Sequence, residues 1–342
     1  MATRTRISSQ TKRGGVTMAE IGQLAGVSQV TVSRALSSPG KVSPETLKRI
    51  EDAIARTGYV PNAVAGALAS RKSNLIAALV PSVTNIVYAS VLHAFSEIMW
   101  GHGYQIMLSE TGLQPDREEK AIAALLSRRP DAILLTGVHH SAQARRMLLN
   151  AGIPVVEIWD MSDTPIDCCV GFSHSDAGRA AADFAVQWGY ETAATITAGD
   201  DRALRRRDAF TSRFETVTRS KVQAMDFDVP ATLGLGREAM AKLIELSLPP
   251  RSVVFCSSDQ FAQGALVEAG VRGLTVPDDV AVIGFGDQEY AASSAPALTS
   301  VRIDRQVLGR TAAEALLTRF SEGPGAHLVK DIGFQIIRRQ SA

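Results

Sequence analysis

Two groups of polar side chains in this 342-residue chain have types and spacing suited to binding chemistry. The first is the run SQVTVSR, residues 28–34, in which polar and apolar residues are mixed as on one short helix. Gln29 can hydrogen-bond the edge of a base, and Arg34 can pair with guanine or with a phosphate. The side chains around them can contact phosphates or a thymine methyl group: Ser28, Val30, Thr31 and Ser33. The run therefore predicts a surface that recognises DNA.

The second group is a pair of arginines, Arg202 and Arg206, which follow an expected strand ending at Thr197. They lie one helical turn apart, so both guanidinium groups can point into one cleft. A guanidinium group binds a carboxylate or a phosphate through two parallel hydrogen bonds. The pair therefore predicts a site for an acidic small molecule, whereas Arg205 and Arg207 are expected on a solvated face.

Short helices must hold the first group. Thr17 can cap a helix in a capping box with Glu20, and Gly26 permits the sharp turn that ends it. Ser28 can then cap the helix that carries the base-contacting run. A third helix is expected over residues 43–58, and the buried apolar positions of the first and third helices are expected to be Ile21, Leu24, Ala25, Leu47, Ile50, Ala53 and Ile54. Two short helices joined by a turn that contains glycine are typical of a helix-turn-helix.

The chain after residue 73 alternates short apolar runs with amphipathic stretches, which predicts parallel sheets with helices on both faces. A first series gives strands at 75–80, 104–108, 132–135 and 155–158 and helices at 88–100, 116–127 and 142–150. A second series gives strands at 193–197, 223–227, 253–256 and 280–284 and helices at 175–188, 206–217, 237–246 and 260–269. The predicted body is completed by a crossover at 298–301, a helix at 306–321 and a strand near 329–337. Two such lobes bind ligands across a cleft, at the carboxyl ends of their strands.

Three segments resemble the lactose-repressor (LacI/GalR) family of bacterial transcription regulators: AEIGQLAGVSQVTVSRAL, KVSPETLKRI and GYVPNAVAGALAS. The resemblance covers essentially the whole chain from Val16. It implies an all-α helix-turn-helix head at 16–60, a hinge helix or linker at 61–72, and an α/β body of two doubly wound lobes like a periplasmic binding protein. The body, 73–342, is expected to bind the effector and to dimerise, with an N-terminal lobe of about 73–172 plus 304–336 and a C-terminal lobe of about 173–303.

The resemblance also implies partners. A homodimer is expected to bind a pseudo-palindromic double-stranded operator, and the hinge helix is expected to enter its minor groove with Leu68 as a wedge. An isolated helix this short is marginal in water, so it is expected to order only on DNA. The residues expected to contact DNA are Thr17, Ser28, Gln29, Val30, Thr31, Ser33, Arg34, Asn62, Ala65 and Leu68.

In the family an R-x-x-G-F pattern holds the effector, and residues 206–210 match it with Ala209 in place of glycine. The stretches VEIWD, FCSSD and GFGD resemble the gluconate-repressor branch, so a sugar acid such as gluconate is the expected effector; a neutral sugar or a purine is the alternative. Asp259 can instead be a helix cap, Trp159 a core residue, and Glu157 a buried partner of a cleft arginine. The residues expected to bind the effector are Ser82, Asn85, Tyr88, Glu157, Trp159, Arg202, Arg206, Ser258, Asp259, Phe285 and Asp287.

Charge is unevenly distributed along the chain. Up to Lys72 there are eleven Lys and Arg against four Asp and Glu, or +7, which leaves 25 against 31, or −6, for the rest. A basic head on an acidic body fits a protein of which one part binds DNA. Residues 1–15 are expected to form a disordered basic tail. This segment lacks the apolar run of a secretory signal, and no apolar stretch elsewhere is long enough to span a membrane. A cytoplasmic protein is therefore expected.

Two other classes of protein are weighed against this interpretation. A solute-binding receptor would have a secretory signal and no helix-turn-helix, and an enzyme would have paired catalytic groups in the cleft. Neither pattern stands out, so no catalysis, cofactor or metal is expected. His139 and His140 are interpreted as a surface loop, and Ser173 and His174 as the turn between lobes. The three cysteines are expected to be reduced thiols.

Overall fold

The computed structural model describes residues 15–62, 72–112, 115–325 and 327–342. The chain divides between Ser73 and Asn74 into two compact units, a head and a body. The expected basic tail, except for Gly15, and the expected hinge residues Ala65 and Leu68 lie outside the described residues.

The head consists of three helices around a small core, as expected for a helix-turn-helix. These are α1 (Met18–Ala25), α2 (Gln29–Ser37) and α3 (Pro44–Thr57). The capping box is present: Glu20 N donates to Thr17 Oγ1 at 3.3 Å, and Thr17 N donates to the Glu20 carboxylate at 2.7 Å. The core contains Ile21, Ala25, Val32, Ala35, Ile50 and Ala53. The prediction for Leu24 was wrong, because its side chain is 56% exposed.

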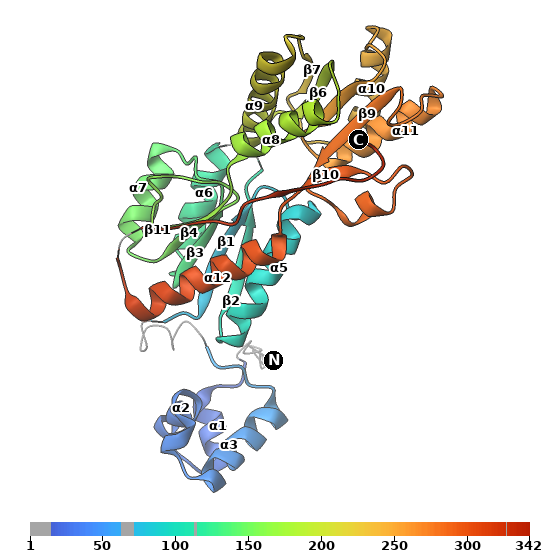
Figure 1. The fold of residues 1–342 in the computed structure, drawn as a ribbon. Helices are drawn as coiled ribbons and strands as arrows, with labels where there is room; N and C mark the ends of the chain where they lie inside the picture. The colour runs from blue at the N-terminus through green and yellow to red at the C-terminus, as the bar shows by residue number, and fades with distance from the viewer. Residues whose placement is uncertain (1–14, 63–71, 113–114, 326) are drawn as a thin grey trace, which may run out of the picture. The chain divides into compact units, whose positions relative to one another are not determined.

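The first lobe of the body is built on a parallel sheet with the strand order β11-β5-β4-β3-β1-β2. Figure 1 shows α5 (Ile86–Gly101) and α12 (Arg305–Glu322) side by side across one face of this sheet. Helices α6 (Pro115–Leu126) and α7 (Ala142–Ala151) pack on the other face. The strands are β1 (Leu75–Val80), β2 (Gln105–Glu110), β3 (Ala132–Thr136), β4 (Val155–Ile158), β5 (Cys168–Gly171) and β11 (Leu328–Asp331).

The second lobe has the sheet order β12-β10-β9-β8-β6-β7, with β12 antiparallel to β10. Helices α8 (His174–Gln187) and α9 (Asp201–Thr218) pack against each other, as do α10 (Leu233–Glu245) and α11 (Asp259–Val271). The strands are β6 (Ala193–Ala198), β7 (Gln223–Phe227), β8 (Ser252–Cys256), β9 (Val280–Phe285), β10 (Thr299–Arg302) and β12 (Gln335–Ile337). A two-lobe α/β body is therefore confirmed.

The body differs from expectation in three places. Strand β5 was not expected, because four residues are too few for a periodic pattern. The single strand expected near 329–337 is two strands, β11 in the first sheet and β12 in the second. Helix α9 begins at Asp201, five residues earlier than expected, because the Asp200 carboxylate caps it by accepting from Ala203 N at 3.0 Å. Within the described chain, the lobes are joined by the segments that follow β5, β10 and β11.

Helices α8 and α9 approach so closely that Gly178 leaves no room for a side chain. A Cβ atom added there would lie 2.2 Å from the carbonyl oxygen of Arg206. Gly178→Ala is therefore expected to lower the free energy of unfolding by about 1–3 kcal/mol, because overpacking forces the two helices apart. Gly270→Ala in α11 is the control, because nothing lies within 4 Å of its added Cβ atom. Denaturant unfolding measures both, and equal stability of the two variants would contradict the close approach.

Candidate DNA-binding surface and ligand cleft

The expected base-contacting residues form an exposed row on the head. Gln29, Val30, Ser33 and Arg34 are exposed on α2, and Val30 is 65% exposed although it is apolar. Val32 and Ala35, on the opposite side of the same helix, are buried in the core. Ser28 Oγ caps α2 by accepting from Thr31 N at 3.2 Å. Burial of one face of α2 thus leaves its first turns free to contact another molecule.

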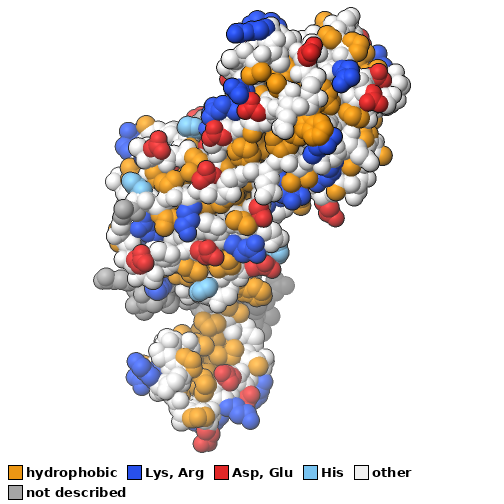
Figure 2. Space-filling view, in the orientation of Figure 1, with side chains coloured by type: hydrophobic (Ala, Val, Ile, Leu, Met, Phe, Trp, Pro, Cys, Tyr) orange, Lys and Arg blue, Asp and Glu red, His pale blue; other side chains and the backbone are white. Residues whose placement is uncertain are grey.

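The described residues on the visible face of the body form no continuous basic surface that could bind DNA. Figure 2 shows acidic and basic side chains interspersed over this face. Asn62, the remaining described residue of the expected DNA-contacting set, is exposed at the end of the head.

The two lobes enclose a cleft of about 650 Å³ at the carboxyl ends of their strands. Eight of the eleven expected effector residues line it: Ser82, Asn85, Tyr88, Trp159, Arg202, Arg206, Ser258 and Phe285. Two of them also cap helices, Asn85 before α5 and Ser258 before α11. The site is therefore assembled from loops and helix starts of both sheets, as expected for a doubly wound body.

Arg206 is the most unusual group in this cleft. It is 5% exposed, and its guanidinium carbon lies 3.8 Å from the ring centroid of Phe285. Nη1 contacts His174 Nδ1 at 2.7 Å, and Nη2 donates to the carbonyl oxygen of Ser257 at 3.0 Å. Among the described residues, no carboxylate forms an ion pair with it, and its Nε has no acceptor. Burial lowers the pKa of Arg206 to about 10, which still leaves a cation at neutral pH.

Arg202 stands next to Arg206 but is compensated. Its Nη2 donates to the hydroxyl of Tyr88 at 3.0 Å, and its Nε lies 3.8 Å from the carboxylate of Asp200. Because Tyr88 belongs to α5 in the first lobe and Arg202 to α9 in the second, this hydrogen bond spans the cleft. The two arginines expected to act together therefore differ: Arg202 lies within ion-pair distance of a carboxylate, whereas among the described residues Arg206 contacts only neutral groups.

Arg205 is partly solvated, with its side chain 30% exposed, but it also bridges the lobes, which was not expected. Its two terminal nitrogens contact both carboxylate oxygens of Asp160, and the longer of these contacts, Nη1 to Oδ1, is 3.1 Å. Asp160 follows β4 in the first lobe, and its side chain is almost fully buried. Arg207, whose side chain is 23% exposed, pairs with the more exposed carboxylates of Asp208 and Asp226.

Three of the expected effector residues lie behind the cleft wall rather than on it. Glu157 is fully buried, and its Oε2 accepts from Ile166 N at 2.7 Å. Asp259, also fully buried, accepts from the Ser300 hydroxyl at 2.6 Å and from Gln288 N at 2.6 Å. Asp287 pairs with Arg302 and with Arg339. These carboxylates fix loops of the protein instead of facing the cavity.

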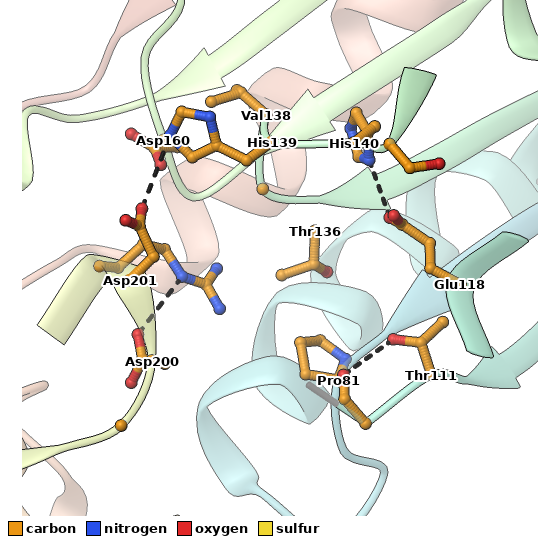
Figure 3. A pocket seen from close by; sticks show the side chains of 15 residues that line it. Pro81, Thr111, Glu118, Thr136, Val138, His139, His140, Asp160, Asp200 and Asp201 are labelled. Atoms are coloured by element: carbon orange, nitrogen blue, oxygen red, sulfur yellow. Dashed lines mark hydrogen bonds and ion pairs between the residues drawn. The ribbon is translucent and has the colours of Figure 1, made fainter. Parts of the chain in front are cut away.

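The expectation that His139 and His140 form a surface loop was wrong for His140, whose side chain is 1% exposed. Its Nδ1 lies 2.8 Å from Glu118, and its Nε2 lies 3.3 Å from Glu157. Figure 3 shows His140 and Glu118 directed toward each other at one end of a second cavity of about 450 Å³. Burial by itself would lower the pKa of His140, but the two carboxylates outweigh it and raise the pKa to about 9.

His174 is one of the cleft residues that sequence reasoning missed. It begins α8 and lines the cavity at 2% exposure, between Arg206 and the carbonyl oxygen of Trp159. Burial and the charge of Arg206 lower its pKa well below the ordinary value. The only signal in the sequence is that His174 follows an apolar run. Its two partners, Trp159 and Arg206, are distant in the sequence and could not be inferred from it.

Neither a metal site nor a membrane span is found in the described part of the chain. No group of three or more His, Cys, Asp or Glu side chains in it is arranged to hold an ion. None of the helices described is both long and apolar enough to cross a bilayer.

Comparison with known proteins places both parts of the chain. A model described as "Bacterial regulatory proteins, lacI family" matches residues 17–62, and one described as "Periplasmic binding protein-like domain" matches residues 182–342. The regulator GntR of Pseudomonas aeruginosa is 35% identical over 96% of both chains. The regulator IdnR of Escherichia coli K12 is 30% identical over 94% of this chain and 97% of its own.

Solved structures agree with this placement. A LacI-family transcriptional regulator from Silicibacter pomeroyi is 31% identical, with a TM-score of 0.89 over 95% of this chain and 99% of its own. A lac repressor dimer bound to operator shares the fold, with a TM-score of 0.84 over 96% and 99% of the two chains at 23% identity. With its helix-turn-helix head and two-lobed body, the chain belongs to the lacI family of bacterial regulatory proteins and is a DNA-binding transcriptional regulator.

Proposed function

We propose that the protein is a repressor that binds a pseudo-palindromic operator as a homodimer and is controlled by a sugar acid such as gluconate in the interlobe cleft. The observation that carries the effector class is the buried cation of Arg206, which forms no ion pair with any carboxylate of the described chain. A buried charge without a partner is costly, so a ligand carboxylate that pairs with it gains affinity.

The remainder of the cleft suits the hydroxyl-bearing part of such a ligand. Tyr88 and Trp159 meet edge to face with their ring centroids 6.0 Å apart, and both line the cavity. Nε1 of Trp159 is a buried donor with no acceptor among the described residues. Aromatic faces with a few polar groups are typical of pockets for small ligands. The relatives named GntR and IdnR support a member of the gluconate-repressor branch.

Regulation follows from the connection between the lobes. An effector that contacts both lobes favours one angle between them, and it changes operator affinity only by its differential affinity for the two states. The operator-bound dimer of the lac repressor supports the same assembly here, with the protein acting in the bacterial cytoplasm, where its DNA lies. The relatives are regulators, which favours a binding role for the cleft over a catalytic one.

Isothermal titration calorimetry of the whole chain tests the effector class. We expect gluconate to bind, and matched neutral sugars such as glucose and cellobiose to bind at least about tenfold more weakly, because they cannot neutralise Arg206. Cellobiose is a relevant comparison, because a solved relative, 26% identical, is a CelR–cellobiose complex. Tight binding of a neutral sugar or a purine, with no response to any aldonate, would replace the sugar acid with that class.

The head gives a second prediction. Arg34→Ala is expected to reduce the preference for a selected operator over random DNA by about tenfold to a hundredfold, because a bidentate contact to a base contributes about 1–3 kcal/mol of discrimination. Arg56→Ala is the control, since it removes one exposed positive charge from the last turn of α3. It should weaken binding to both DNAs by a similar factor. Fluorescence anisotropy at fixed salt measures both, and an Arg34→Ala variant that loses both affinities equally would contradict a base contact.

A further inference from the structure

His174 contacts both lobes at the place where the chain passes from one to the other. Its Nε2 lies 2.7 Å from the carbonyl oxygen of Trp159, which follows β4 in the first lobe. Its Nδ1 lies 2.7 Å from Nη1 of Arg206, on α9 of the second lobe. A carbonyl oxygen only accepts and a guanidinium group only donates, so the imidazole must donate from Nε2 and accept at Nδ1. Both contacts together require the neutral ring with its proton on Nε2.

The other contacts of Arg206 are also uncharged. They are the carbonyl oxygen of Ser257 at 3.0 Å and the ring of Phe285, with its centroid 3.8 Å from the guanidinium carbon. Asp200, whose charge acts on Arg206 without a direct contact, caps α9 and lies 3.8 Å from Nε of Arg202. The guanidinium group of Arg206 is thus held in place by neutral acceptors and one aromatic face. The charge of Asp200 favours its cation from a distance, but among the described residues no carboxylate forms an ion pair with it.

We propose that His174 is the specificity-determining residue of the cleft: as a neutral hydrogen-bond acceptor it orients Arg206 and leaves the arginine's charge to the ligand. The inference rests on the proposed role of Arg206 as the effector's anchor. A carboxylate at position 174 could accept the same hydrogen bond but would neutralise Arg206, and the cleft would then lose its selectivity for acids.

Two nearly isosteric substitutions separate charge from geometry. His174→Asn and His174→Asp each place an oxygen two bonds from Cβ, where Nδ1 of the imidazole lies, and they differ by one negative charge. Without ligand, the melting temperature of His174→Asp is expected to be about 2–4 °C or more above that of His174→Asn, because the new carboxylate can form an ion pair with Arg206. In an Arg206→Gln background this order should reverse, since the new carboxylate is then buried without a cation. The same order in both backgrounds would overturn the inference.

Ligand binding gives the second readout. His174→Asn should bind gluconate within about tenfold of the unchanged protein, whereas His174→Asp should bind it about tenfold to a hundredfold more weakly than His174→Asn. Equal affinities of the two variants would also overturn the inference. If the unchanged protein binds no gluconate, the proposed effector fails. The ligand-free unfolding comparison still decides the role of His174, so the two failures are distinguishable.

Discussion

Arg206→Gln is expected to lower the affinity for gluconate by about a hundredfold or more, because a charge-assisted bidentate pair with a buried guanidinium contributes about 2–4 kcal/mol. The same variant should be no less stable than the unchanged protein without ligand. In the unchanged protein Arg206 is 5% exposed and forms no ion pair within the described chain, so removing its charge removes a cost of folding. Calorimetric titration and thermal unfolding measure the two effects.

Arg207→Gln is the matched control on the same helix. Arg207 pairs at the surface with Asp226, with Nη1 2.7 Å from Oδ2, and with Asp208. Its substitution should leave gluconate affinity within about twofold, since exposed ion pairs contribute about 0–1 kcal/mol. If both substitutions weaken gluconate binding equally, the effect is one of net charge, and Arg206 is not the anchor.

His140→Asn is expected to lower the free energy of unfolding at pH 7 by about 3–5 kcal/mol, because it leaves two carboxylates close together without their shared cation. His140 has Nδ1 2.8 Å from Glu118 and Nε2 3.3 Å from Glu157. Folding raises the pKa of His140 from 6.5 to about 9. The stability that this gives is fully present below about pH 6.5 and is lost as the pH rises through 9.

The pH dependence distinguishes this cluster from simple packing. The unchanged protein should lose on the order of 3 kcal/mol of stability between pH 6.5 and 9.5, and His140→Asn should lack that decrease. His139→Asn is the control, because the neighbouring histidine is exposed and should leave the decrease intact. Denaturant unfolding across this range measures all three proteins. A His140→Asn variant with an undiminished decrease would show that another group titrates.

Local patterns in the sequence predicted the head and most of the body. Thr17 and Glu20 form the expected capping box, and buried Val32 and Ala35 leave Gln29 and Arg34 exposed, because capping and periodicity are properties of neighbouring residues. The alternating strands and helices likewise located the cleft, since the carboxyl ends of parallel strands meet at one edge of each sheet.

Partners that are distant in the sequence could not be predicted in this way. His140 is 22 residues from Glu118, and Arg206 is 32 residues from His174. No local pattern reveals that a histidine will be buried between two carboxylates, or that Asp160 will pair with Arg205 across the lobes. For the same reason Asp287, which was expected to contact the effector, was not recognised as a partner of Arg302 and Arg339.

The central claim is that one chain couples sequence-specific DNA binding to recognition of an acid. The most direct test is to measure operator binding with and without gluconate. A palindromic fragment selected from a random library should bind about a thousandfold or more tightly than a scrambled fragment at physiological salt. Saturating gluconate should change that affinity, and operator should change gluconate affinity by the same factor, because the coupling is reciprocal. Equal binding to both fragments, or operator affinity unaffected by bound gluconate, would contradict the account.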